Sequence, residues 1–142
     1  MTTRETIVAP TIEWIDVSDR EDERYRRTLA ERRAPAVREA HRLLAEDRYD
    51  EAEQAIRRVD DSMYGAVEIA KLYRRRLEQL AARGVNEATK PHLTRVFERA
   101  VRAAYGAYPE PHTAIEAEQY DTGRETDRAE LVRILGYDPR GI

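Results

Sequence analysis

Apolar residues recur at helical spacing through most of the chain. The best-formed run shares one face of a helix with 3.6 residues per turn and comprises Leu93, Val96, Phe97, Ala100, Val101, Ala104 and Tyr108. A second run has the closer spacing of helices that pack at shallow angles and comprises Met63, Ala66, Val67, Ala70, Tyr73, Leu77 and Leu80. These runs predict two long helices, one at about residues 62–83 and one that begins at Asn86 or Thr89 and ends at Gly106.

Capping residues predict further helices on the N-terminal side. Ser18 and Glu21 form the Ser-x-x-Glu pattern of a capping box, so a helix is expected to begin there. Pro35 is expected to break or kink it, because the residue before a proline avoids the α-helical region. After Pro35, a new apolar face consists of Val37, Ala40, His41 and Leu44. Asp50 is expected to cap the helix that follows.

The C-terminal part predicts two short helices. Thr113 and Glu116 form a second capping box that opens a helix towards Tyr120. Asp127 is expected to cap a last helix, which ends at Gly136. The predicted fold is therefore all-α: a compact bundle of five to six helices stacked as antiparallel hairpins, forming a single domain at residues 18–142.

Residues 1–17 show a different pattern. The segment from Thr11 to Val17 is rich in β-branched and aromatic residues, as β-strands are. Because the chain contains only one such segment, it cannot form a sheet without a partner. We expect an extended N-terminal arm, either clamped against its own domain or completed as a strand by another chain.

One stretch, LLAEDRYDEAEQAI at residues 43–56, resembles a tetratricopeptide-repeat hairpin. The matching positions are Tyr49, Asp50, Glu51, Ala52 and Ala55, whereas Asp47 replaces the glycine usual in the turn. The resemblance covers about residues 37–59 and does not recur with the period of about 34 residues of a true array. It implies a protein-binding scaffold; the alternative is an ordinary pair of antiparallel helices.

Few side chains suggest chemistry. The chain has no cysteine and only three histidines, which are far apart in sequence: His41, His92 and His112. Their spacing from acidic residues does not fit a metal site on facing helices. Nothing singles out a catalytic pair among the 28 acidic residues. We expect a non-enzymatic protein without a cofactor or metal, in which His41 is packed on an apolar helix face.

Arginine clusters leave nucleic-acid binding open as an alternative. The net charge of −3 gives no overall attraction to nucleic acid. Successive arginines on a helix point about 100° apart, so those at 74–76 cannot all face one groove. An i,i+4 pair between Arg74 and Glu78 further favours a solvated, self-neutralised face. In the alternative, a nucleic-acid-associated subunit or regulator would use Arg26, Arg27, Arg74 and Arg75.

The leading interpretation is a helical interaction or assembly protein, acting as a scaffold or adaptor within a homo- or hetero-oligomer. An unpaired strand-like arm and a thin apolar stripe on the first helix suit a protein interface better than an isolated monomer. The candidate interface residues are Ile12, Trp14, Ile15, Tyr25 and Leu29. No apolar stretch approaches the length of a membrane span, and the N-terminus lacks the apolar run of a secretory signal, so a cytoplasmic protein is expected.

Overall fold

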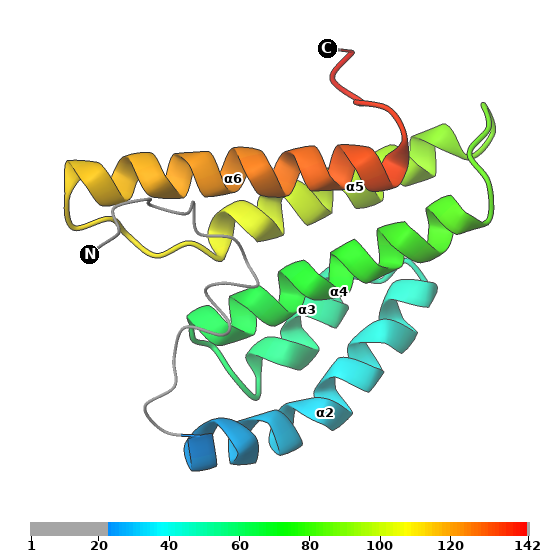
Figure 1. Cartoon of the computed structure of the whole chain (residues 1–142). Coiled ribbons are helices and arrows are strands. Elements are labelled where there is room, and N and C mark those ends of the chain that lie inside the picture. The colour runs from blue at the N-terminus through cyan, green and yellow to red at the C-terminus, as the bar shows by residue number, and fades with distance from the viewer. Residues whose placement is uncertain (1–22, 142) are drawn as a thin grey trace.

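Five helices form the part of the protein that the structure describes, residues 23–141 of a computed structural model (Figure 1). They are α2 (Glu23–Ala45), α3 (Tyr49–Arg57), α4 (Met63–Ala82), α5 (Lys90–Gly106) and α6 (Ala114–Leu135). Residues 23–141 contain no β-strand. The all-α prediction is confirmed. The predicted arm at residues 1–17 and the capping box at Ser18 lie outside the described residues.

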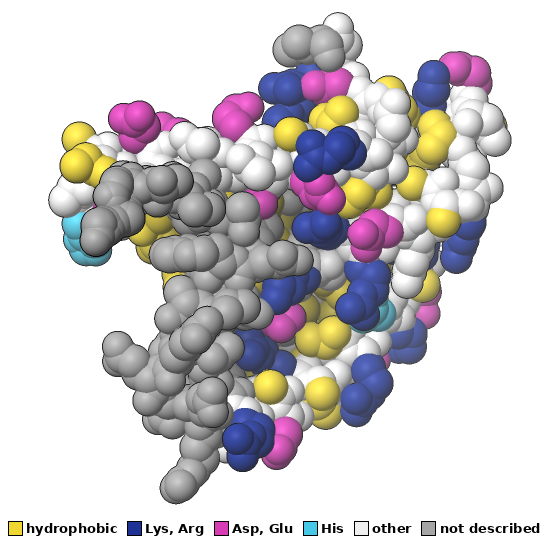
Figure 2. All heavy atoms as spheres, viewed as in Figure 1, with side chains coloured by type: hydrophobic (Ala, Val, Ile, Leu, Met, Phe, Trp, Pro, Cys, Tyr) yellow, Lys and Arg dark blue, Asp and Glu magenta, His cyan; other side chains and the backbone are white. Residues whose placement is uncertain are grey.

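Helix α4 is the centre of the bundle. It packs chiefly against α5 and also contacts α2, α3 and α6. Helix α2 pairs with α3, and α5 pairs with α6, so a pair of helices lies on each side of α4 (Figure 1). Acidic and basic side chains lie close together over much of the outer surface (Figure 2), as the high charge content predicts.

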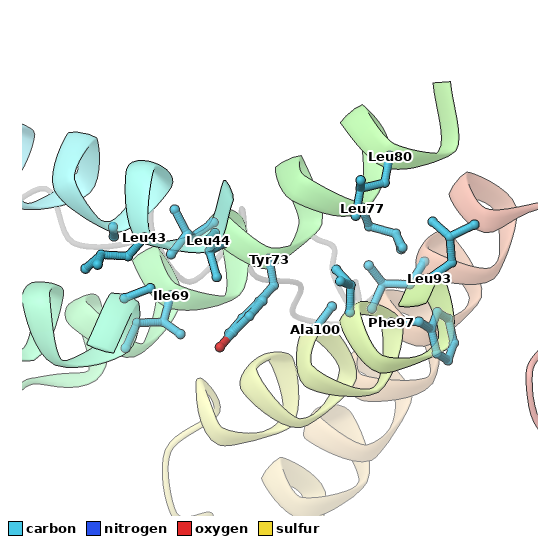
Figure 3. Packing of buried hydrophobic residues seen from close by; sticks show 14 of the residues in the cluster. Leu43, Leu44, Ile69, Tyr73, Leu77, Leu80, Leu93, Phe97 and Ala100 are labelled. Carbon is cyan, nitrogen blue, oxygen red and sulfur yellow. The ribbon is translucent and has the colours of Figure 1, made fainter. Parts of the chain in front are cut away.

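The apolar faces predicted from spacing meet in one large core. In Figure 3, Leu77 of α4 points towards Leu93 of α5, while Leu43 and Leu44 extend from α2. The largest side chains with almost no exposure are Tyr73, Phe97, Leu44, Ile56, Ile69, Leu77, Leu93, Val67 and Val96. Burying an apolar side chain of this size stabilises a fold by about 1.5–3 kcal/mol, so this core holds the five helices together.

Several helix ends lie where the capping residues predicted them. The Ser62 hydroxyl accepts a hydrogen bond from the Tyr64 backbone N–H at the start of α4. Gly84 follows α4 with a φ of 109°, and Gly136 follows α6 with a φ of 92°, a left-handed backbone that glycine adopts without strain. The Thr113 hydroxyl accepts from the Glu116 backbone N–H at the start of α6.

Both candidate caps of α5 take part in one turn. The Asn86 side chain accepts hydrogen bonds from the backbone N–H groups of Ala88 and Thr89. In return, the Thr89 hydroxyl accepts from the Asn86 backbone N–H at 2.9 Å. This reciprocal arrangement satisfies three backbone donors immediately before α5.

At Pro35 the helix is bent but not broken, so one of the two expected alternatives is found, whereas the predicted boundary within α6 is wrong. Helix α2 continues through Pro35, although its axis changes direction between its N-terminal and C-terminal parts in Figure 1. A proline removes one hydrogen bond from a helix, and packing of the C-terminal part of α2 on α3 and α4 maintains the rest. Helix α6 is also continuous, because Tyr120 near its start and Leu131 and Leu135 near its end all pack onto the bundle.

The turn between α2 and α3 also differs from the prediction. Helix α3 begins at Tyr49, so Asp50 lies in its first turn and is not its cap. Asp47 has a φ of 59°, in the left-handed region that aspartate tolerates better than most residues other than glycine. The turn therefore closes without the glycine that is usual at this position in the tetratricopeptide-repeat pattern.

The turn between α3 and α4 is tightly packed. Asp60, only 6% exposed, accepts a hydrogen bond from the Ser62 backbone N–H at 3.0 Å through Oδ1. Its other carboxylate oxygen, Oδ2, lies 3.5 Å from a guanidinium nitrogen of Arg33 in α2. The Asp60 carbonyl group faces Gly65 so closely that a Cβ atom added to Gly65 would lie 1.9 Å from the carbonyl oxygen. The turn thus links α2, α3 and the first turn of α4.

Candidate functional site: a basic groove between α2 and α4

An open groove of about 650 Å³ lies between α2 and α4. We call it the α2–α4 groove, and it is lined by His41, Arg42, Ala45, Arg75, Arg76, Gln79 and Arg83. Basic side chains gather over this part of the surface in Figure 2, with a histidine among them. Among the described residues the lining contains four arginines and no acidic side chain, which distinguishes it from the mixed charges elsewhere on the described surface.

Helical periodicity explains why residues of α4 and its C-terminal end line the groove together. Arg75, Gln79 and Arg83 are spaced four residues apart, so they lie along one face of the helix. The apolar residues Tyr73, Leu77 and Leu80 are directed to the core instead. With a rise of 1.5 Å per residue, the basic face from 75 to 83 extends for about 12 Å along the groove.

The arginines of the groove differ in their pairing. Arg42 forms salt bridges with Glu39 and, at 2.9 Å, with Glu46, both on α2. Within residues 23–141, the salt bridges involve none of the three arginines that α4 contributes, Arg75, Arg76 and Arg83. These three positive charges are therefore available to an anionic ligand.

Arg76 is the most unusual of these side chains. It is only 8% exposed, and its Nε atom has no hydrogen-bond partner within the described part of the chain. Burying a guanidinium group without a counter-ion or a full set of acceptors is unfavourable. An anion in the groove would offset this cost, because it would place an opposite charge beside the Arg76 guanidinium.

His41 was expected to be packed on an apolar helix face, but it lies in the wall of the open groove. It is half-buried and lines the groove beside Ala45. Burial lowers the pKa of His41 below its usual 6.5, and the positive charges of Arg75 and Arg76 lower it further. At neutral pH the imidazole is therefore uncharged and has one N–H donor.

Adjacent arginines on α4 have different environments, as the 100° rotation per residue predicts. Arg74 points away from the groove and contacts α6, where its guanidinium lies 3.0 Å from a carboxylate oxygen of Glu130. The expected pair with Glu78 is also present, at 4.0 Å. Arg75 lines the groove instead. Of the two nucleic-acid candidates on α4, only Arg75 is thus available to a ligand.

The other predicted site residues do not reach the groove. Arg27 is exposed in the first turns of α2, 14 residues before His41 and so about 20 Å away along a helix. Side chains in that part of α2, including Tyr25, Arg26 and Leu29, are not among the described ones. Ile12, Trp14 and Ile15 lie outside the described residues. The proposed interface around them stays a prediction.

Four residues that line the groove were not expected from the sequence: Arg42, Arg76, Gln79 and Arg83. A signal for the α4 side existed in the four-residue spacing from Arg75 to Arg83. The α2 side had no such signal, because Arg42 and its neighbouring glutamates fit an ordinary solvated helix. Only the packing of α2 against α4 shows that these two helix faces form one site.

A second polar cluster, between α3, α4 and α5, has the features of a structural network. The Tyr73 hydroxyl donates to a carboxylate oxygen of Glu53 at 2.5 Å, and Tyr73 itself is completely buried. Arg99 of α5 pairs with Asp50 at 2.9 Å and lies over the ring of Tyr49. Burial and the Glu53 carboxylate raise the pKa of Tyr73 well above its usual 10, so the hydroxyl stays protonated and bonded.

Comparisons with protein-family models, curated proteins and solved structures find no match for this chain. The resemblance of residues 43–56 to a tetratricopeptide-repeat hairpin therefore stays a prediction. Between residues 23 and 141, no three His, Asp or Glu side chains are grouped as a metal ion would require. None of the helices described has both the length and the apolar character needed to cross a membrane.

Proposed function

We propose that this chain is a non-enzymatic helical interaction protein that binds an acidic segment of a partner protein in the α2–α4 groove. The observation that carries the proposal is the set of three arginines, Arg75, Arg76 and Arg83, that line the groove without acidic partners among the described residues. We also propose, as expected from the sequence, that the chain is a cytoplasmic subunit of a homo- or hetero-oligomer.

The dimensions of the groove suit an extended acidic segment. Side chains two residues apart in an extended chain point the same way and lie about 7 Å apart, so three alternate carboxylates span about 13 Å. The basic face of α4 extends for about 12 Å. A guanidinium group binds a carboxylate with two parallel hydrogen bonds, so the outer carboxylates of such a segment can meet Arg75 and Arg76 at one end of the groove and Arg83 at the other.

Several features favour a protein over nucleic acid as the ligand. Proteins that bind single-stranded nucleic acid combine positive charge with aromatic side chains on which bases stack. As far as the structure describes the lining of the α2–α4 groove, it includes no Tyr, Trp or Phe. In addition, Arg74 is engaged by Glu130, and the chain as a whole has a net charge of −3. The groove is therefore a local anionic site and not part of a long positive surface.

Fluorescence anisotropy tests the proposal. The probe is a labelled eight-residue peptide of alternating Glu and Ser, and a Lys/Ser peptide of the same length is its counterpart. We expect the acidic peptide alone to bind at low salt, and Arg75→Glu to weaken it by about tenfold or more, because like charges then meet in the groove. Arg102→Glu is the matched control: Arg102 is exposed on α5, outside the groove, and undergoes the same charge change.

Three outcomes would contradict the proposal. The first is no binding of the acidic peptide at low salt. The second is equal weakening by Arg75→Glu and Arg102→Glu, which would indicate attraction to overall charge. The third is that a labelled oligothymidine binds more tightly than the peptide and loses this binding in Arg75→Glu. That result would establish the nucleic-acid alternative in place of the protein partner.

The oligomer part of the proposal has its own test. Size-exclusion chromatography with light scattering measures the mass of the full chain, and Trp14→Ala alters the most bulky of the predicted interface residues. We expect an oligomer whose mass falls in the variant. A monomer with a protease-resistant N-terminal segment would contradict the predicted interface without affecting the groove.

A further inference from the structure

The end of the α2–α4 groove where His41, Arg75 and Arg76 meet has more positive charge than one carboxylate neutralises. Arg75 and Arg76 are consecutive on α4, and both are close enough to act on His41 across the groove. Arg76 is 8% exposed and has an Nε–H without an acceptor. None of the acidic side chains within residues 23–141 lines this end. Any bound group must therefore bring close to two negative charges and several acceptor atoms to one place.

We propose that this end of the groove binds a phosphomonoester, so that the partner segment carries a phosphorylated side chain. This inference rests on the proposed function and names the chemistry of its ligand. A phosphorylated serine, threonine or tyrosine has a charge of about −1.5 to −2 near pH 7 and three acceptor oxygens. One such group can accept from Arg75, from the Arg76 guanidinium and from the imidazole N–H of His41 together, whereas a carboxylate has two oxygens and a single charge.

Proton uptake by His41 accompanies binding. The described charged groups that share the groove with it are Arg42 from its own helix, Arg75 and Arg76 from α4, and Arg83 directly after α4, while Glu39 and Glu46 are paired with Arg42. In the free groove, burial and the neighbouring arginines keep the pKa of His41 below 6.5. A dianion beside the ring outweighs these effects, because it favours the imidazolium form. Binding then raises the pKa of His41 above 6.5, and the ligand binds more tightly as His41 becomes protonated.

The two types of ligand differ in their pH dependence. As pH falls from 8 towards 6.5, His41 protonation strengthens the binding of either ligand. Below about pH 6, the phosphate takes up its own second proton and loses charge, so its binding weakens again. Glutamate carboxylates stay charged down to about pH 4.3, so an acidic peptide continues to bind in this range. A maximum in affinity near pH 6–6.5 is therefore specific to the phosphorylated ligand.

The experiment compares three peptides on the full chain by isothermal titration calorimetry. The phosphopeptide has the sequence Gly-Glu-Ser-Glu-Gly-Glu with phosphate on the serine. The first control is the same peptide without phosphate, and the second control, the glutamate peptide, has glutamate in place of the serine. We expect the phosphopeptide to bind about tenfold more tightly than the glutamate peptide at pH 6.5, a difference of about 1.4 kcal/mol. The NMR signal of the His41 ring should show its pKa rising above 6.5 when the phosphopeptide binds.

Variants separate the residues involved without altering the buried Arg76. Arg75→Gln removes one exposed positive charge from the groove and should remove most of the preference for the phosphopeptide. His41→Gln keeps an N–H donor but cannot be protonated, so it should preserve binding at pH 8 and abolish the gain between pH 8 and 6.5. Arg102→Gln, outside the groove, should leave both results unchanged.

Each contrary result has a distinct meaning. Equal affinity for the phosphorylated and glutamate peptides, or an unchanged pKa of His41 on binding, overturns the phosphomonoester site, although the acidic-segment proposal stands if Arg75→Glu still weakens binding more than Arg102→Glu does. Failure of both peptides overturns both proposals. If inorganic phosphate binds as tightly as the phosphopeptide, the ligand is a free phosphate-bearing molecule, and the assignment to a protein segment is wrong.

Discussion

Replacing Gly65 with alanine tests how tightly the turn between α3 and α4 is closed. Gly65 is buried in the first turns of α4 and faces the backbone of Asp60. An alanine Cβ would lie 1.9 Å from the Asp60 carbonyl oxygen and 2.9 Å from its carbonyl carbon, whereas ordinary contacts begin at 3.4 Å. The oxygen would have to move by about 1.5 Å to restore a normal contact.

The cost of this movement follows from what holds Asp60 in place. Its carboxylate accepts from Ser62 and pairs with Arg33, so a shift of its backbone disturbs a cap and a buried ion pair together. Overpacking a well-filled site costs about 1–3 kcal/mol, and the fixed backbone places this substitution near 3 kcal/mol. Alanine recovers about 1 kcal/mol because it favours a helix more than glycine does. We expect a net loss of about 2 kcal/mol in the free energy of unfolding.

Urea denaturation and a thermal melt measure this loss. A loss of about 2 kcal/mol lowers the melting temperature of a chain of this size by roughly 4–8 °C. Gly106→Ala is the matched control, because an added Cβ there meets no atom within 4 Å and the residue ends α5. We expect its stability to be unchanged or slightly higher. A Gly65→Ala protein as stable as the parent, or an equal loss in Gly106→Ala, would refute the argument from the Asp60 contact.

Three further predictions concern polar groups in the described part of the chain. Tyr73→Phe removes the hydrogen bond to Glu53 and should lower the free energy of unfolding by about 1 kcal/mol in urea denaturation; no change would show that the bond contributes nothing. Asp60→Ala leaves a buried guanidinium group unpaired and should cost about 3–5 kcal/mol in the same assay, so a loss below about 1 kcal/mol would contradict it. Hydrogen bonds from Arg140 lower the pKa of Asp138 to about 2, so their ion pair is fully formed above pH 3.8 and is lost as pH falls through 2. An NMR titration of the Asp138 carboxyl group should show this midpoint, and Arg140→Gln should move it towards 3.8.

Local patterns were sufficient to predict most of the helices. The run of apolar residues from Met63 to Leu80, with Ser62 before it and Gly84 after it, was enough to predict both ends of α4. Errors arose where packing overrides a local signal. Pro35 disfavours a helix but lies within α2, which is supported by α3 and α4. A capping residue within a helix, such as Asp127 in α6, is not a boundary if the helix packs on both sides of it.

The candidate site was much less predictable. The sequence distinguishes Arg75 from Arg74 by their direction on the helix, but the acidic residue that neutralises Arg74 is Glu130, far away in sequence on α6. The absence of such a partner for Arg75 depends on the same long-range packing. The tight contact at Gly65 has the same origin, because a glycine within a helix gives no indication of which backbone lies against it.

The different roles of neighbouring arginines on α4 also limit how this protein can change during evolution. Arg74 anchors α6, whereas Arg75 and Arg76 line the opposite side of the same helix. One residue inserted or deleted earlier in α4 would rotate everything after it by about 100°. Each side chain would then take the direction of its neighbour in the sequence, so that Arg74 would no longer face Glu130, and the core residues would turn away from the core. Point substitutions at the surface of this helix are therefore tolerable in descendants, whereas changes in its length are not.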